Sequence, residues 1–260
     1  MLKILIKLNQ FCAKRQLRRY IQGKGIEIGA LNQPLQVNRK NAEVIYVDRQ
    51  EVKSLIELNP ETDENKILSP DIVADAEDLG CFSDESLDFV IARHVLEHIP
   101  NPIKALHEFY RVLKDHSILY ISLPDKRFSM DNERPVTQIN HIVQDYENNV
   151  KISDCNDHFK EWLEFVELKK DKPIAKTLDG IKKHTIHFHV WDPDSMVEIF
   201  NYINERYNFS FILKDYYYQK SDMNIIFIFE KIKGHKLKEK ISLPLKEMTI
   251  LLKIYYFIFK

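Results

Sequence analysis

Short runs of apolar residues recur between residues 25 and 123 and predict strands that are buried on both faces. The runs cover residues 25–30 (GIEIGA), 44–47, 72–74, 87–92 and 118–123. Near-continuous apolar runs of this length are typical of parallel strands covered by helices. Because helices or connections separate the runs, the pattern predicts an α/β fold with a doubly wound sheet.

The best-defined unit of this pattern lies between residues 86 and 124. A strand at 87–92 is followed by a polar turn with Arg93 and His94, then by a helix beginning near Pro102 and a strand at 118–123. This order predicts a parallel βαβ unit. Ligands bind beyond the carboxyl ends of parallel strands, so a site is expected at Arg93, His94, Glu97 and His98.

A polar and aromatic segment, residues 125–191, interrupts the alternation of strands and helices. It begins as a loop, and residues 138–168 have a mostly helical pattern that includes DHFKEWLEF. This composition predicts an acceptor-binding insertion or lid. A further helix is expected from Asp192 and Pro193, and apolar runs at 209–217 and 225–229 predict a β-hairpin that completes the sheet.

The two ends of the chain differ from its body. Residues 1–22 have the spacing of an amphipathic helix that caps the sheet, and residues 231–260 are basic and then apolar. The tail is expected to dock on the body or on a second subunit, and peripheral membrane contact is the alternative for both ends. Between them, residues 23–230 are predicted to form one catalytic domain that contains the 125–191 insertion.

Charge is distributed unevenly, although the net charge is only −1. Residues 1–25 carry +7 and residues 231–260 carry +6, which leaves −14 on residues 26–230. An acidic body argues against a nucleic-acid partner and favours a small-molecule acceptor. Three cysteines without close spacing, and no apolar run of membrane-spanning length, predict a cytoplasmic protein, with peripheral contact at the inner membrane left open.

Acidic residues lie at or near the ends of three successive predicted strands. Glu27, Asp48 and Asp75 should meet at one edge of the sheet, beside Gly29. An acid after the second strand is a usual partner of a ribose hydroxyl pair, but no G-x-G-x-x-G follows the first strand. Glu27 would repel a pyrophosphate and suits a cationic sulfonium, so the charges favour S-adenosylmethionine over NAD.

Six sequence blocks carry a family resemblance. In order they are GIEIGALNQPL, VIYVDR, DIVADAEDL, SLDFVIARHVLEHIPNPIKALHEFYRVLK, YISLPDKRFSMDNERPVT and HFHVWDPDSM. Together, over about residues 23–200, they resemble bacterial class I S-adenosylmethionine-dependent methyltransferases, in particular a branch associated with surface-polysaccharide (capsule) biosynthesis. The resemblance implies a Rossmann-like seven-stranded sheet, mostly parallel with a C-terminal antiparallel hairpin and with helices on both faces.

The same resemblance implies a cofactor site for S-adenosylmethionine, with S-adenosylhomocysteine as the product. The methionine part would lie among Glu27, Gly29, Ala30 and Leu31, and the ribose at Asp48 beside Arg49. Adenine would be held by Asp75, Ala76 and Glu77. Arg93 and His94 would line the side where the methyl group is transferred.

The identity of the acceptor decides which residues carry the chemistry. A sugar hydroxyl needs a general base, for which His94, His98, His187 and His189 are the candidates. An anionic acceptor, such as a phosphate or phosphoramidate, would instead be held by Lys126, Arg127 and Arg134, with Arg127 acting in catalysis. His187 and His189 are also expected to line the acceptor pocket.

Two histidine motifs raise the question of a metal. HVLEH at 94–98 spells H-x-x-E-H, but a buried strand before it and Asn101-Pro102 after it leave little more than one helical turn. HTIHFHVW at 184–191 could ligate a metal or serve a structural role, and an acceptor pocket is favoured. We therefore expect no metal. A non-catalytic nucleotide-binding protein and an NAD-dependent oxidoreductase are the alternative functions.

Overall fold

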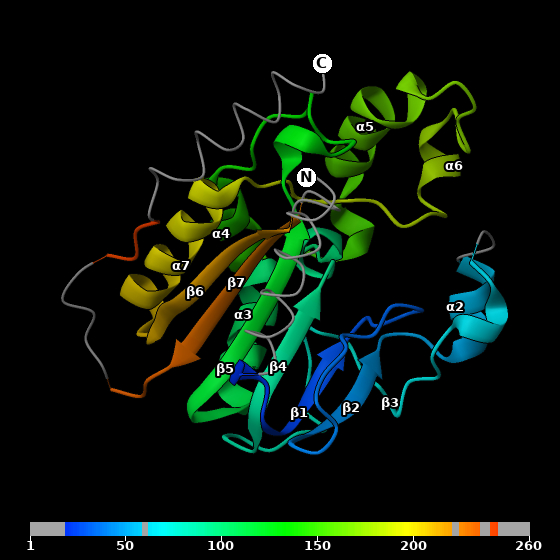
Figure 1. The fold of residues 1–260 in the computed structure, drawn as a ribbon. Helices are drawn as coiled ribbons and strands as arrows, with labels where there is room; N and C mark the ends of the chain where they lie inside the picture. Colours follow the sequence, from blue (N-terminus) through cyan, green and yellow to red (C-terminus); the bar gives the residue numbers. More distant parts are fainter. Residues whose placement is uncertain (1–18, 59–61, 220–223, 235–239, 244–260) are drawn as a thin grey trace, which may run out of the picture.

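One mixed β-sheet forms the centre of the protein (Figure 1). The computed structural model describes residues 19–58, 62–219, 224–234 and 240–243. Seven strands lie in the order β3-β2-β1-β4-β5-β7-β6, with β7 antiparallel to both of its neighbours and the other six strands pointing the same way. The strands are β1 (Gly23–Ile28), β2 (Ala42–Asp48), β3 (Ile72–Val73), β4 (Leu87–Arg93), β5 (Leu113–Pro124), β6 (Phe211–Gln219) and β7 (Asn224–Lys231). The predicted seven-stranded sheet with a C-terminal hairpin is confirmed.

The register of the central strands brings their carboxyl ends to one edge. Ile28 of β1 lies beside Val47 of β2 and Ala92 of β4. The turn after β1 therefore meets the residues that follow β2 and β4. This is the edge at which open parallel sheets bind ligands.

The two faces of the sheet have separate cores. On one face, α3 (Pro102–Val112), α4 (Ile139–Glu147) and α7 (Pro193–Tyr207) pack through residues such as Leu106, Ile142 and Phe200. On the other face, β2, β4, β5 and β7 contribute a second cluster that includes Phe89 and Tyr120. As predicted, α3 begins with Asn101 as N-cap and Pro102 in the first turn, and α2 (Val52–Leu58) follows β2.

The insertion between β5 and α7 has a core of its own. It contains α4, α5 (Asn156–Phe165) and α6 (Leu178–Ile181), with short 3-10 turns η3 (Lys126–Phe128), η4 (Ile152–Asp154) and η5 (Glu167–Lys169). Phe159 and Trp162 of α5 are buried in this core together with Ile181 and Phe188. The aromatic residues of the insertion therefore stabilise its own packing. Two further 3-10 turns, η1 (Glu64–Lys66) and η2 (Leu96–His98), lie earlier in the chain.

The predicted terminal segments lie largely outside the described residues. Of residues 1–22 only 19–22 are described, and of residues 231–260 only 231–234 and 240–243. Among the described helices, none has the length and apolar character that crossing a membrane requires.

Candidate functional site

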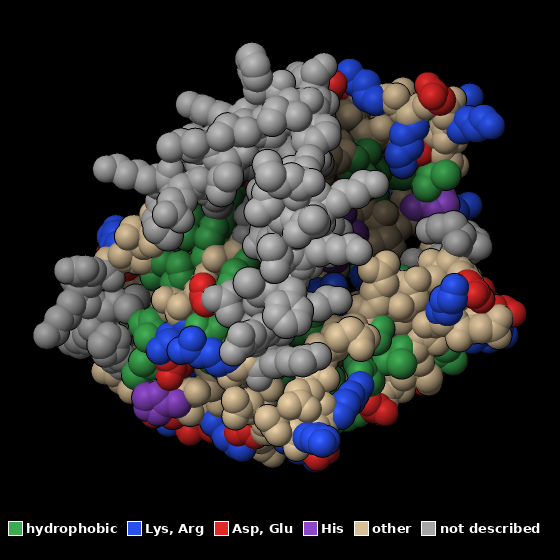
Figure 2. Space-filling view, in the orientation of Figure 1, with side chains coloured by type: hydrophobic (Ala, Val, Ile, Leu, Met, Phe, Trp, Pro, Cys, Tyr) green, Lys and Arg blue, Asp and Glu red, His purple; other side chains and the backbone are tan. Residues whose placement is uncertain are grey.

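A pocket of about 610 Å³ lies at the edge where β1 to β4 end. This volume is within the usual range for small-molecule sites. One side consists of residues that follow the strands, and the other of η2, η4 and the segment before α7, with Thr185 in its wall. Figure 2 shows a hollow on the side of the molecule where α2 faces the insertion. The predicted site residues in its wall are Gly29, Leu31, Asp48, Arg49, Asp75, Ala76, Glu77, His94 and His98.

The turn after β1 requires glycine. Gly29 has a φ of +63°, and its N–H donates to the Val47 carbonyl at 2.9 Å. A Cβ at this position would lie 3.2 Å from Val95 Cγ2. The absent side chain lets the backbone pass close to a ligand in the pocket.

Two carboxylates at strand ends face the same pocket. Asp48 ends β2, and burial raises the pKa of its carboxyl group. Asp75 follows β3, and its Oδ1 accepts from the Glu77 N–H at 2.9 Å, which fixes the turn. Carboxylate oxygens so placed can accept hydrogen bonds from ribose hydroxyls and from an exocyclic amine.

Glu27, Ala30 and Arg93 are not part of the pocket wall. Glu27 is fully buried, and both of its oxygens accept from the Leu35 N–H, at 2.9 and 3.0 Å. Its other partner is Arg93, whose Nη1 lies 3.7 Å away and also donates to the Gln33 carbonyl at 2.6 Å. Burial raises the pKa of Glu27. The Glu27–Arg93 pair therefore holds the loop after β1.

His94 has both ring nitrogens engaged. The Asn224 amide lies 2.9 Å from Nε2, and since that amide donates, Nδ1 carries the hydrogen and faces Glu97 Oε1 at 3.1 Å. Its φ of +53° places the ring against these two partners. His94 therefore positions Glu97 and has no lone pair left to take a proton.

His98 has the opposite arrangement. Its Nδ1 lies 2.8 Å from the Ile186 carbonyl, which can only accept, so Nδ1 carries the hydrogen and Nε2 the lone pair. Burial lowers the pKa of His98 to about 4. Next to it, Glu97 is buried, and no described residue offers a hydrogen-bond partner to its Oε2. For Glu97, burial would raise the pKa, but the His94 hydrogen bond and nearby histidines outweigh it and the pKa is lowered.

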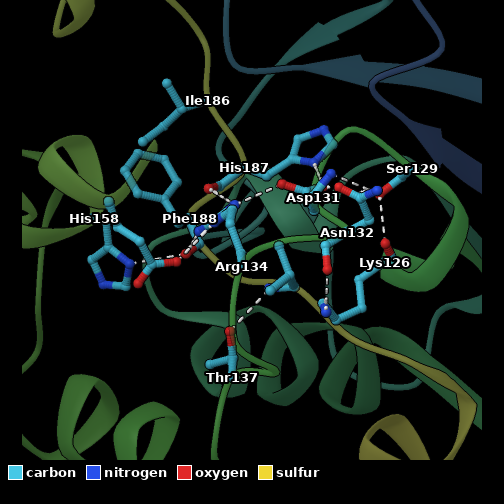
Figure 3. Close-up of polar contacts among 12 residues, drawn as sticks. Lys126, Ser129, Asp131, Asn132, Arg134, Thr137, His158, Ile186, His187 and Phe188 are labelled. Carbon is cyan, nitrogen blue, oxygen red and sulfur yellow. Dashed lines mark hydrogen bonds and ion pairs between the residues drawn. The ribbon is translucent and has the colours of Figure 1, made fainter. Parts of the chain in front are cut away.

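His187 stands beside His98 and belongs to a wider polar network (Figure 3). The two rings are edge-on, with centroids 4.7 Å apart. His187 Nδ1 lies 2.6 Å from Asp131 Oδ2. Burial would raise the pKa of Asp131, but the contacts with His187 and Arg134 outweigh burial and the pKa is lowered. A carboxylate on one nitrogen fixes the tautomer and orientation of the ring. His187 is not in the pocket wall, and it borders the pocket through His98.

Arg134 does not offer its guanidinium to an acceptor. It is 1% exposed and bonds Asp131 at 2.8 Å, Glu161 at 2.7 Å and the carbonyls of His187 and Phe188 at 2.9 and 3.1 Å. These partners take four of the five N–H donors of the guanidinium. The expected capture of an anion by Arg134 is therefore replaced by a structural role.

The other two predicted cations also have partners within the loop after β5. Arg127 makes a bidentate pair with the buried Asp125, with Nη2 2.6 Å from Oδ2, and this contact raises the pKa of Arg127. Lys126 Nζ donates to the Asn132 carbonyl at 3.1 Å. Neither side chain lines the pocket.

His189 is fully buried away from the pocket wall. Its Nε2 lies 3.1 Å from the Pro100 carbonyl, and its Nδ1 has no hydrogen-bond partner within the described part of the chain. The structure instead groups it with three residues that the motifs did not single out, His141, Asp145 and His158. In the sequence, the i, i+4 spacing of His141 and Asp145, which places both side chains on one face of a helix, could have indicated this group. Glu97, His98 and His187 form a second group with metal-ligating side chains.

Sequence comparison identifies a domain in the region that builds the pocket. Residues 23–121 match the family model for a methyltransferase domain. These residues include β1 to β4, α3 and most of β5, and therefore every strand end in the pocket wall. None of the curated proteins compared matches the chain.

Solved structures with similar folds include a zinc-dependent alcohol dehydrogenase of Rhodobacter sphaeroides. It is 12% identical, with a TM-score of 0.53, and the match covers 86% of this chain and 94% of that one. A second is a methyltransferase of Thermotoga maritima that is 15% identical, with a TM-score of 0.43 over 87% of this chain and 91% of that one. At these identities the likeness concerns the fold alone.

Proposed function

We propose that the chain is a class I S-adenosylmethionine-dependent methyltransferase that methylates an oxygen atom of a small acceptor, because residues 23–121 match the family model for a methyltransferase domain. The acceptor we propose is carbohydrate-related, free or phosphorylated. The proposed setting, surface-polysaccharide biosynthesis, is supported by the resemblance of the six sequence blocks.

The strand-end side of the pocket suits the cofactor. The close turn at Gly29 and the carboxylates of Asp48 and Asp75 match a ligand with a cationic centre, a ribose and an adenine. We assign the ribose to Asp48 and the adenine to Asp75 and Ala76. When bound, S-adenosylmethionine supplies a methyl group activated by its sulfonium.

One observation carries the proposed mechanism: His98 is in the pocket wall and its Nε2 has the lone pair. With the cofactor bound, His98 Nε2 would take the hydroxyl proton of the acceptor, whose oxygen would receive the methyl group, and S-adenosylhomocysteine would be left as the product. Asp131 and His187 hold the neighbouring ring edge-on and exclude water from one side of His98. Proton transfer of this kind contributes about 100- to 10,000-fold to a rate.

In the second version of the mechanism, the acceptor is an anion and needs no general base. It would depend on Lys126 and Arg127, whose partners are Asn132 and Asp125. Neither residue lines the pocket, which favours the version with a general base.

The test measures release of S-adenosylhomocysteine with a panel of free sugars and sugar phosphates. In His98→Asn the amide can still donate to the Ile186 carbonyl, but the Nε2 lone pair is lost. We expect a rate at least about 100-fold lower, with S-adenosylhomocysteine binding within about twofold of wild type. His184→Asn, at an exposed position, is the matched control. Loss of activity in Lys126→Ala and Arg127→Ala, with His98→Asn unaffected, would reject the general base.

A further inference from the structure

Four side chains of the insertion converge on one point outside the pocket wall. His141 and Asp145 lie on α4, His158 on α5, and His189 on the segment before α7. His141 Nε2 is 3.2 Å from His158 Nε2 and 3.4 Å from Asp145 Oδ2. Asp145 Oδ2 is 4.0 Å from His158 Nε2 and 3.8 Å from His189 Nε2.

The two shorter distances, 3.2 and 3.4 Å, match the edges of a tetrahedral metal site, and the two longer ones, 3.8 and 4.0 Å, would have to shorten by a few tenths of an ångström on binding. Zinc binds imidazole nitrogen and carboxylate oxygen at about 2.0–2.2 Å, which places neighbouring ligand atoms about 3.3 Å apart. The three imidazole rings are edge-on to one another, with interplanar angles of 62°, 66° and 82°. Rings so arranged can direct one nitrogen each to a common centre.

Two buried atoms of the group have no hydrogen-bond partner among the residues that the structure describes. They are Asp145 Oδ2, on a side chain that is 9% exposed, and His189 Nδ1, on a side chain that is 0% exposed. Leaving a buried carboxylate oxygen without a partner costs free energy. A bound cation would satisfy the carboxylate and remove the need for two imidazole nitrogens to share one hydrogen.

The surrounding contacts orient the ligands. His158 Nδ1 donates to the Phe188 carbonyl at 2.9 Å, which leaves the Nε2 lone pair directed at the group. The Asp145 carbonyl accepts from Asn101 Nδ2 at 3.2 Å. Metal-binding histidines in proteins are usually held in this way through their second nitrogen.

We propose that His141, Asp145, His158 and one nitrogen of His189 bind a Zn²⁺ ion that joins α4 to α5 and to the segment before α7. Imidazole and carboxylate ligands suit zinc, and four protein ligands leave no open position, as in structural zinc sites. The guanidinium of Arg134, the nearby cation, is paired with Asp131 and Glu161.

A structural ion fits the small core of the insertion. The cluster around Phe159, Trp162 and Ile181 is separate from the main core. Small cores often need a metal or a disulfide for stability, and the described cysteines are free. The proposal does not rest on the assignment of the acceptor or of the base.

Metal content is the first test. The full chain, expressed without a polyhistidine tag in zinc-supplemented medium, should hold about one zinc per chain by mass spectrometry. His141→Ala, at a position 46% exposed, should lose most of it, and the exposed His184→Ala should keep it. Zinc kept in His141→Ala but lost in His98→Asn would place the ion at the Glu97 group and overturn the proposal.

Thermal unfolding of the wild type tests the zinc site without a substitution, and His141→Ala serves as the control. Chelation of the wild type should lower Tm by about 5 °C or more, and zinc chloride should restore it. Chelator and zinc should leave the Tm of His141→Ala unchanged. Wild type that is purified without metal and shows no response to zinc would reject the site.

Discussion

The lowered pKa of His98, the candidate base, makes the stability of the protein depend on pH. Its folded pKa of about 4 lies below the ordinary histidine value near 6.5, so between these pH values the unfolded chain binds more protons than the folded one. The stability that this group contributes is therefore present above about pH 6.5 and lost as the pH falls toward 4. In wild type, the free energy of unfolding should fall in this window by up to about 1.4 kcal/mol per pH unit more than in His98→Asn.

Urea unfolding at a series of pH values measures this difference. The buried Glu97 and the neighbouring His94 and His187 are the same in both proteins, so subtraction isolates His98. His184→Asn should follow the wild-type curve. Identical curves for wild type and His98→Asn would show that His98 is not held in its neutral form.

Arg134 shows how far burial changes the role of a charged residue. Its guanidinium has four described partners and is 1% exposed. Arg134→Lys keeps the charge but cannot reproduce the planar fork, and should lower the free energy of unfolding by about 3–5 kcal/mol. Arg206→Lys, on the exposed side of α7, should change it by less than about 0.5 kcal/mol. An unchanged stability with a raised acceptor KM would instead restore the acceptor-binding role.

The sequence could not reveal this role because the partners of Arg134 come from elsewhere in the chain. Glu161 lies on α5 and the two carbonyls belong to residues 187 and 188. A loop arginine after a strand has the same pattern whether it is exposed or buried. The residue type shows that a guanidinium is present at position 134. Whether that guanidinium can reach an anionic acceptor depends on how the insertion packs around it.

At the scale of elements, the N-terminus of α3 connects the domain to the insertion. Asn101 Oδ1 accepts from the Lys104 N–H at 3.1 Å, and Nδ2 donates to the Asp145 carbonyl. Asn101→Ser should keep the cap and lose only the second contact, costing about 1–2 kcal/mol. Asn101→Ala should lose both and cost about 2–4 kcal/mol in urea unfolding. Equal losses in the two variants would mean that the cap contributes nothing.

Elements were predictable where the pattern is local. Parallel strands covered on both sides are mostly apolar, so the apolar runs in β1, β2 and β4 stand out in the sequence, and Asn101-Pro102 marks the start of α3. Boundaries were less predictable: β5 begins at Leu113, directly after α3, although residues 115–117 are polar. Leu113 pairs with Leu87 of β4 and regular pairing resumes at Ile118, so the polar residues lie at an irregularity of the strand that an apolar pattern leaves out.

For the whole molecule, strand order made the cofactor half of the site predictable. Asp48 and Asp75 follow strands that lie side by side, so a topological rule places them together. The histidine half depends on how the insertion folds back, with Ile186 against His98 and His189 against Pro100. Contacts between residues about 90 positions apart have no local sequence signal.

Ligand-dependent melting tests the whole assignment. S-adenosylhomocysteine at 100 times its Kd should stabilise the protein by about 2.7 kcal/mol, a rise in Tm of about 5–10 °C. NAD should give no shift, because Glu27, which is buried close to the turn after β1, disfavours a pyrophosphate there. Asp48→Asn should weaken S-adenosylhomocysteine binding by about tenfold or more, and the exposed Asp63→Asn should not. Stabilisation by NAD instead would favour oxidoreduction, and stabilisation by S-adenosylhomocysteine without turnover of any acceptor would favour a non-catalytic binding protein.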